Sequence, residues 1–266
     1  MMRLNNKVII VTGSTTGIGK GIARRCVAEG ARVLIHGLES VWADALLLEL
    51  GEESASVCIC DLAEEASPRL LISTALSRFG RIDGIVNNAA KVASSDIHST
   101  DLAYLQGMLN INTTAPLMLI REALPELAKN KGAVLNIGSV NAYSGEPNLL
   151  AYSMSKGALM TMTRNLGDAL FRTYGIRVNQ VNPGWVLTEN EADRKRKHGL
   201  AEDWYRDLPD VYAPAGRLLT PDEIAAAVIY WLSDESGPVS GQVVDLEQYP
   251  VIGRNPPKDT STIPKK

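Results

Sequence analysis

Short apolar runs rich in β-branched residues recur along this 266-residue chain, with segments of helical periodicity between them. Strands that alternate with helices predict right-handed crossovers and a parallel sheet that helices cover on both faces. A chain of this length can bury the core of one such α/β domain. We therefore predict a single-domain, doubly wound sheet of about seven parallel strands. The strand runs are 8–11, 33–35, 57–59, 85–86, 134–137, 178–181 and 243–246.

Several helix boundaries can also be predicted. An apolar stripe through Ile18, Ile22 and Cys26 indicates a helix between the first two strand runs, and Gly30 is suited to end it. Segment 152–173 contains no proline and no pair of adjacent glycines, so we predict a long helix there that ends near Gly175. A further helix should begin at Pro221, with Thr220 as its N-cap, and continue through 231–232.

A glycine-rich loop, 12–20, follows the first strand and leads into the first helix. Glycines allow a tight turn and close approach of the backbone, and the helix N-terminus favours a phosphate, so this Rossmann-like arrangement predicts a dinucleotide cofactor. A nucleotide-triphosphatase loop is the rival. It fails because Ser14 occupies its first glycine position and Gly21, not Ser or Thr, follows Lys20.

Tyr152 and Lys156 are four residues apart, so their side chains share one face of the long helix. A phenol with a pKa near 10 is a poor base at neutral pH, and a nearby ammonium group stabilises the phenolate. Such a pair is common on solvated helices, but with the glycine loop it indicates proton transfer coupled to hydride transfer.

From about 7 to 246 the sequence resembles the short-chain dehydrogenase/reductase family, classical type. The order and spacing of several separated motifs agree with that family. They are Thr12-Gly13-x-x-x-Gly17-Ile18-Gly19, Asn87-Asn88-Ala89-Ala90, Asn112, Ser139, Tyr152-x-x-x-Lys156 and Asn182-Pro183-Gly184.

The resemblance implies the roles of the catalytic residues. Tyr152 would be the general acid/base, and Lys156 would lower its pKa and bind the nicotinamide ribose. Ser139 would hydrogen-bond the substrate oxygen, and Asn112 would hold a water in a proton relay. Without the family, Ser139 and Asn112 would be interpreted as a strand-end serine and a buried helix asparagine.

The same resemblance implies the cofactor contacts. Ala90 stands where glycine is more usual, and its methyl should be tolerated unless φ is positive. Asp61 matches the acid that contacts adenine, but Asp61-Leu62-Ala63-Glu64 also has capping-box spacing, and both roles are compatible. The predicted cofactor-binding residues are Gly13, Thr15, Thr16, Gly17, Ile18, His36, Gly37, Asp61, Leu62, Asn88, Ala89, Ala90, Tyr152, Lys156, Pro183, Gly184 and Val186.

The choice between NAD and NADP depends on the end of the second strand. An acid there usually binds the 2'-hydroxyl of NAD, and an arginine accommodates the 2'-phosphate of NADP. Gly37 and Leu38 occupy those positions, and Thr16 replaces a basic residue often found in NADP loops. Without a cation for the phosphate, we favour NAD, with His36 or Glu39 near the ribose.

Substrate recognition should lie beyond the carboxyl ends of the strands, in loop 141–147 and a lid at about 186–215. Ser139, Asn141, Glu146, Tyr152 and Trp185 are the candidate substrate residues. Aromatic residues gather around the lid of a chain with only 5% aromatics, and they could cover a sugar ring or an apolar carbonyl compound, or pack the lid on the body.

A basic run, 194–198, lies inside the lid, and Glu189, Glu191 and Asp193 precede it. It is either a solvated helix face that the acids neutralise or a surface that attracts an anionic substrate. Glu146 would oppose an anionic group deep in the pocket if its side chain points inward.

Composition excludes other classes. A formal net charge of -3 argues against nucleic-acid binding through bulk charge, and no stretch approaches the length of a membrane span. The three cysteines, Cys26, Cys58 and Cys60, complete no zinc pattern, and we expect buried thiols and no metal. The N-terminus lacks the apolar run of a signal peptide, so a cytoplasmic location is expected.

We expect a domain over 1–253 and a polar, proline-containing tail over 254–266. The family implies a homotetramer or homodimer. The expected activity is NAD(P)-dependent interconversion of a secondary alcohol and a carbonyl in a small molecule such as a sugar, polyol, hydroxy acid or 3-oxoacyl compound. The alternative is an inactive cofactor-binding sensor or scaffold, although a sensor has no need of the four catalytic residues.

Overall fold

The computed structural model describes residues 2–252, and the predicted tail 254–266 lies outside them. Seven parallel strands form one sheet in the order β3-β2-β1-β4-β5-β6-β7, which confirms the predicted fold class. The strands are β1 (Val8–Val11), β2 (Arg32–Gly37), β3 (Ala55–Ile59), β4 (Gly84–Asn87), β5 (Ala133–Ile137), β6 (Arg177–Pro183) and β7 (Val243–Leu246).

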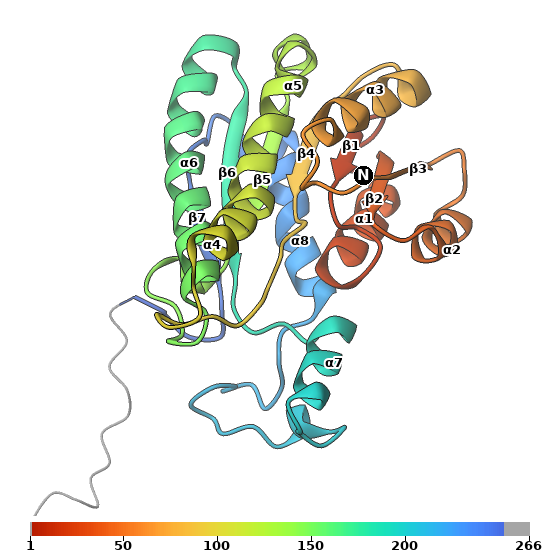
Figure 1. The fold of residues 1–266 in the computed structure, drawn as a ribbon. Coiled ribbons are helices and arrows are strands. Elements are labelled where there is room, and N and C mark those ends of the chain that lie inside the picture. The colour runs from red at the N-terminus through yellow and green to blue at the C-terminus, as the bar shows by residue number, and fades with distance from the viewer. Residues whose placement is uncertain (1, 253–266) are drawn as a thin grey trace, which may run out of the picture.

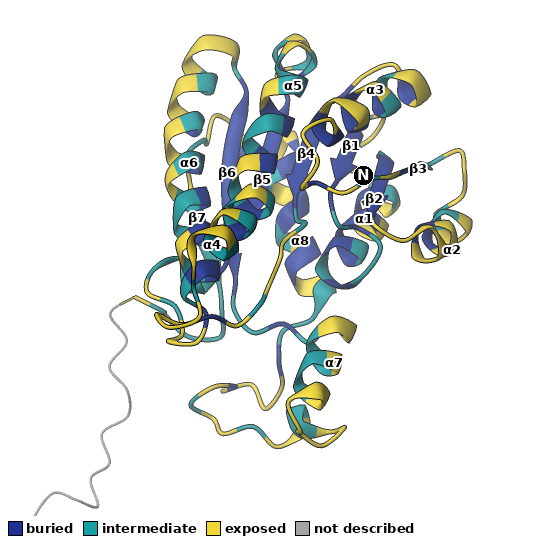
Figure 2. Cartoon of the chain, in the orientation of Figure 1, coloured by how far each residue is buried: buried dark blue, intermediate teal, exposed yellow. Residues whose placement is uncertain are grey.

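Helices cover both faces of the sheet (Figure 1). Alternate residues of a strand point to opposite faces, so Ile9 packs in the core with α1, α2 and α8, and Ile10 packs in the core with α3, α5 and α6. Figure 2 shows the strands buried between these layers. The α-helices are α1 (Gly17–Ala28), α2 (Ser40–Leu50), α3 (Ser67–Phe79), α4 (Leu102–Leu109), α5 (Ala115–Asn130), α6 (Leu150–Tyr174), α7 (Glu189–Lys197) and α8 (Pro221–Leu232).

The predicted helix signals are confirmed at three places. α1 ends one residue before Glu29, and Gly30 follows with φ of 89°. α6 ends at the left-handed Gly175, and α8 begins at Pro221 with the Thr220 side chain and Glu223 forming a capping box.

The capping role suggested for Asp61 is wrong. α3 begins at Ser67, six residues further on, and Asp61 instead accepts a hydrogen bond from the Ala63 backbone at 2.9 Å. The carboxylate closes a local turn, because Pro68 in the first turn of α3 places the helix start later in the chain.

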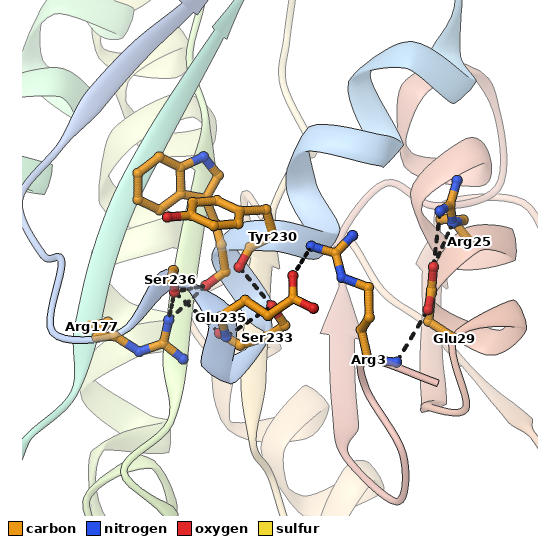
Figure 3. Close-up of polar contacts among 9 residues, drawn as sticks. Arg3, Arg25, Glu29, Arg177, Tyr230, Ser233, Glu235 and Ser236 are labelled. Carbon is orange, nitrogen blue, oxygen red and sulfur yellow. Dashed lines mark hydrogen bonds and ion pairs between the residues drawn. The ribbon is translucent and has the colours of Figure 1, made fainter. Parts of the chain in front are cut away.

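A buried arginine holds the C-terminus of α8 against the sheet (Figure 3). Arg177, at the start of β6, donates to the Trp231 carbonyl at 3.0 Å and to the Ser236 hydroxyl. A cation at this position complements the negative end of the helix dipole. On the other side of α8's end, Arg3 pairs with Glu235 at 2.5 Å and so ties the N-terminal segment to the same region.

The strand order reverses between β1 and β4, whose neighbours extend in opposite directions along the sheet. In doubly wound folds ligands bind at this reversal, outside the carboxyl ends of the strands. The segment with α7 lies beyond those ends in Figure 1. The fold therefore places the glycine loop, the strand ends and the lid around one region.

Candidate active site

A cleft of about 1570 Å³ lies at the carboxyl ends of the strands. Every residue predicted to bind the cofactor lines it, and so does every candidate substrate residue. Of the four predicted catalytic residues, Ser139, Tyr152 and Lys156 line the cleft, and Asn112 lies behind its wall. Motifs that are far apart in the sequence therefore meet in one site.

The glycine loop has the geometry that its sequence predicts. Gly13 and Gly17 have φ of 59° and 54°, and a Cβ at Gly13 would lie 2.9 Å from the Ala89 Cα. A Cβ at Gly19 would collide with the Gly13 carbonyl oxygen. Asn88 donates to the carbonyls of Thr12 and Gly13, both at 2.9 Å. The loop can fold this tightly against Ala89 and against itself only because Gly13 and Gly19 carry no side chain.

Ala90 has no positive φ, because only Asn6 and Lys131 adopt one among the described non-glycine residues. The methyl that replaces the usual glycine is exposed in the cleft wall. The sequence-based expectation of tolerance is confirmed.

The His36 imidazole holds the glycine loop through a hydrogen bond to its backbone. The Gly13 N–H donates to its Nδ1 at 2.9 Å, which leaves the proton on Nε2, 3.1 Å from the Cys60 carbonyl oxygen. Burial lowers the pKa of the imidazole, so the ring stays neutral. Both ring nitrogens are used within the protein, and Glu39 is the better candidate for the ribose.

The glycine at position 37 has a structural reason that the sequence pattern did not reveal. A Cβ at Gly37 would lie 2.5 Å from the Thr15 Cγ2, so Thr15 fills the space that an acid at 37 would need. Leu38 is 66% exposed at the same rim, and the Glu39 carboxylate accepts from the Trp42 indole at 2.8 Å. The rim of the cleft here is apolar and acidic.

Tyr152 and Lys156 lie in the first two turns of α6 and are both buried. The Lys156 ammonium lies 5.7 Å from the centroid of the Tyr152 ring and donates to the Ile137 carbonyl at 2.7 Å. Burial lowers the pKa of Lys156 to about 8. The pair therefore lies on one helical face, as predicted, and both residues line the cleft.

Burial also raises the pKa of the Tyr152 phenol above its usual value. A hydrogen bond with Ser139 and the charge of Arg194 act in the opposite direction, and Glu191 adds to the increase. Desolvation outweighs these contributions because the phenolate loses its water. In this arrangement the phenol holds its proton at neutral pH, which suits donation to a carbonyl oxygen.

Ser139 follows β5 and is held by its neighbours. Its Oγ accepts from the Asn141 N–H at 3.1 Å, and its own N–H donates to the Asn182 Oδ1 at 3.2 Å. Gly138 precedes it, and a Cβ there would collide with the Asn182 side chain. The serine hydroxyl therefore faces Tyr152 from a fixed backbone.

Asn112 lies in a π-helical turn, Asn110–Thr114, between α4 and α5. Its Oδ1 accepts from the Lys91 N–H at 2.8 Å, and its Nδ2 donates to the Lys91 carbonyl at 3.0 Å and to the Ser155 hydroxyl at 2.9 Å. Single π turns in helices often mark functional sites. Here the turn joins the cleft wall at Lys91 to the helix that carries Tyr152.

The lid is closed at its base by β-type hydrogen bonds. Leu187 donates to the Leu219 carbonyl at 2.8 Å, and Leu219 donates to the Trp185 carbonyl at 3.1 Å. Between these points lie α7 and a short 3-10 turn, Trp204–Arg206. Trp185 and Trp204 stack with ring centroids 5.2 Å apart. Trp185 lines the cleft, as expected of an aromatic residue that covers a substrate. Trp204 stacks on Trp185 and does not line the cleft, as expected of an aromatic residue that packs the lid.

Acidic neighbours pair much of the basic run. Arg194 binds Glu191 at 2.6 Å, Lys195 lies 4.0 Å from the same carboxylate, and Arg196 pairs with Asp193. The Lys195 ammonium also lies 5.0 Å from the Trp185 ring centroid. This arrangement favours local neutralisation over attraction of an anion.

Sequence reasoning missed several residues that line the cleft, among them Thr188, Asn190 and Glu247. Thr188 caps α7 through a bond from the Glu191 N–H at 3.1 Å, and its methyl lies against Gly17. Asn190 donates to the Thr16 hydroxyl at 3.1 Å and so joins lid to glycine loop. The N-cap pattern of Thr188 and Glu191 was visible in the sequence; the contacts across the cleft were not.

Cys26 and Cys58 are buried and Cys60 is half-buried, and all three are free thiols. Within residues 2–252, His, Cys, Asp and Glu form no group of three that could hold a metal ion. No helix in the same range is long and apolar enough to cross a membrane.

A doubly wound sheet, a glycine loop at its strand reversal and a buried tyrosine–lysine pair define a nicotinamide-dependent oxidoreductase. Residues 13–247 match a family model described as enoyl-(acyl carrier protein) reductase. The chain belongs to the short-chain dehydrogenase/reductase family. It is an NAD(P)-dependent enzyme that interconverts a secondary alcohol and a carbonyl in a small molecule.

Curated relatives cover most of the chain. The chain is 34% identical over 248 residues to 2-(S)-hydroxypropyl-CoM dehydrogenase 3 of Xanthobacter autotrophicus. The aligned region covers 90% of this chain and 94% of that relative. The chain is also 34% identical to L-fucose dehydrogenase of Bos taurus, over 87% and 85% of the two chains. Glucose 1-dehydrogenase 2 of Bacillus subtilis is 32% identical, over 92% and 94%.

Proposed function

We propose that Tyr152 is the general acid/base of this enzyme and that Ser139 holds the substrate oxygen beside it. The observation that carries the proposal is that Ser139, Tyr152 and Lys156 line one cleft, where the Ser139 hydroxyl acts to lower the pKa of the Tyr152 phenol. Lys156 lies one helical turn further along α6, and its ammonium group near the Tyr152 ring stabilises the phenolate. Asn112 orders the wall behind them and is the predicted relay residue.

In the direction of oxidation, Tyr152 in its phenolate form accepts the proton of the substrate hydroxyl while hydride leaves the carbon that bears this hydroxyl. In the direction of reduction, it donates a proton to the carbonyl oxygen, and the Ser139 hydroxyl stabilises the negative charge that develops there. Lys156 keeps a positive charge near the phenolate that forms. When bound, the nicotinamide ring supplies the hydride or takes it up.

The residues present fit a dinucleotide. The glycine loop lines the cleft, and the N-terminus of α1, which favours a phosphate, follows it. Asp61, Leu62 and 88–90 would border the adenosine. Lys156 and 183–186 would border the nicotinamide side.

The rim near 36–42 supports NAD over NADP. The lining residues there are His36, Gly37, Leu38, Glu39 and Trp42. None carries a positive charge, since burial keeps His36 neutral, and the Glu39 carboxylate would repel a 2'-phosphate. A carboxylate at this rim can instead accept hydrogen bonds from ribose hydroxyls.

The proposal extends to the whole protein by analogy with the family. The catalytic unit covers 1–253 and includes the lid at about 186–215. We propose assembly as a homotetramer or homodimer and a cytoplasmic location, with a small alcohol or carbonyl compound as the partner molecule.

Absorbance at the reduced-nicotinamide band tests the function. Purified protein is offered NAD or NADP with polyols, sugars and hydroxy acids, and NADH or NADPH with the corresponding ketones. We expect turnover of secondary alcohols or ketones, with kcat/KM at least about tenfold higher with NAD than with NADP. This factor corresponds to one or two hydrogen bonds to charged groups that the 2'-phosphate of NADP would lack here. Tight cofactor binding with no turnover of any compound would instead support the sensor.

A further inference from the structure

Glu247 lines the cleft, and its carboxylate has no part in the proton transfer. It follows β7, whose register with β6 pairs Leu246 with Pro183, so Glu247 stands beside Gly184. A Cβ at Gly184 would collide with this carboxylate. The close approach is possible only because residue 184 is glycine.

Two backbone groups fix the carboxylate. The Trp185 N–H donates to its Oε2 at 3.1 Å, and the Gln248 N–H donates to its Oε1 at 2.8 Å. A carboxylate has about four acceptor sites, so each oxygen keeps one for a further donor. Glu247 lines the cleft next to Trp185, whose indole is itself fixed by a bond to Glu191 at 2.9 Å.

The charged residues that line the cleft oppose an anionic substrate. Arg194 and Lys195 lie against Glu191, and the Lys91 ammonium lies 5.6 Å from the Tyr104 ring centroid. Glu146 and Glu247 form no ion pair among the described residues. The Lys156 ammonium donates to the Ile137 carbonyl beside Tyr152, and the two lid cations are held by Glu191, whereas Glu146 and Glu247 have no cationic partner in the described part of the chain and remain free to accept hydrogen bonds.

We propose that Glu247 is a specificity-determining residue that selects a neutral, polyhydroxylated substrate by accepting a hydrogen bond from a second hydroxyl group near the reacting one. The proposal rests on the proposed function and deepens it. The fixed carboxylate offers an acceptor for a hydroxyl group of the substrate. It rejects an acid through repulsion between like charges.

Three probes with one ring test the proposal: cyclohexanol, cyclohexane-1,2-diol and 2-hydroxycyclohexane-1-carboxylate. For the unmodified enzyme with NAD, we expect kcat/KM for the diol to exceed that for cyclohexanol by about 10- to 100-fold, the range for a hydrogen bond to a charged group. The hydroxy acid should be the poorest substrate.

Glu247→Gln keeps the shape and an oxygen for the Trp185 N–H but removes the charge. It should reduce the preference for the diol by about tenfold and improve the hydroxy acid, with cyclohexanol nearly unchanged. Glu52→Gln, an exposed glutamate outside the cleft, should leave all three values unchanged. If Glu247 only held the backbone, Glu247→Gln would change kcat/KM for all three probes by equal factors, and this result would contradict the proposal.

Binding of the same probes to the NAD complex, measured by calorimetry, separates the two proposals. A diol that binds no more tightly than cyclohexanol, or a hydroxy acid that binds best, would overturn the role of Glu247. Tighter binding of the diol that Glu247→Gln abolishes would support it even where hydride transfer is absent. Absence of hydride transfer with every alcohol and ketone would refute only the proposed function.

Discussion

At the scale of single residues, Lys156 shows how burial changes a group that sequence spacing identifies. The spacing predicts that its ammonium shares a helical face with Tyr152, and the structure confirms this. The sequence does not show that the ammonium is buried against the Ile137 carbonyl, with its pKa lowered to about 8. That value depends on contacts between α6 and β5, which no local pattern contains.

The lowered pKa of Lys156 predicts a pH dependence of stability. Between about pH 8 and the ordinary lysine pKa of 10.5, the unfolded chain binds a proton that the folded chain has lost, so the free energy of unfolding should rise with pH. Urea unfolding at pH 7.5 and pH 9.5 measures this. The increase should be smaller in Lys156→Met, because that variant has no proton to lose, and an equal increase in both proteins would contradict the assignment.

His36 and Gly37 mark the limit of prediction at the residue scale. Position along the second strand places both at the cofactor rim, and both do line the cleft. Their roles depend on segments far away in the sequence: Gly13 and Cys60 hold the imidazole, and Thr15 fills the space beside Gly37. Motif matching identifies the positions, whereas packing determines what each side chain can still bind.

At the scale of elements, a polar network joins β5, β6 and β7 beneath the catalytic serine. The Asp245 Oδ1 accepts from the Tyr143 hydroxyl at 2.9 Å and from the Asn182 Nδ2 at 3.0 Å. Asn182 in turn accepts the Ser139 N–H. Tyr143 follows the short turn after Ser139, so Asp245 holds this segment from two sides and is a positioning residue.

Replacement of Asp245 should therefore affect the rate more than cofactor binding. Asp245→Ala leaves two donors unpaired, and we expect kcat to fall about tenfold or more while the KM for NAD stays within about twofold. Asp245→Asn retains a side-chain oxygen that can accept both bonds and should recover most of the rate. Steady-state kinetics of the two variants test this, and equal losses in both would show that the network does not position Ser139.

Elements with a strong periodic pattern were predictable. All seven strand runs lie within observed strands, because a parallel sheet buried on both faces leaves continuous apolar runs. The capping box of α8 and the glycine after α6 fixed two helix ends. The π turn that carries Asn112 was not predictable, since its geometry follows from bonds to Lys91 and Ser155 on other elements.

At the scale of the whole molecule, the cleft lies between the carboxyl edge of the sheet and a lid formed by an insertion after β6. The proposed acid/base and its serine lie where the end of β5 and the start of α6 bring Ser139 and Tyr152 together. The proposed specificity residue, Glu247, lies where the segment after β7 meets the start of the lid. The motifs therefore predict the reaction class, and the substrate depends on packing between segments with no recognisable motif.

The measurement that tests the account most directly is hydride transfer by Tyr152→Phe. The variant keeps the ring that packs at the head of α6 but loses the hydroxyl, so turnover should fall by about 100- to 10,000-fold, the usual contribution of a general acid/base. The Kd for NAD should stay within about twofold. Tyr174→Phe, at the exposed C-terminal end of the same helix, should retain full activity. Turnover in Tyr152→Phe equal to that of the unmodified enzyme would contradict the assignment of the acid/base.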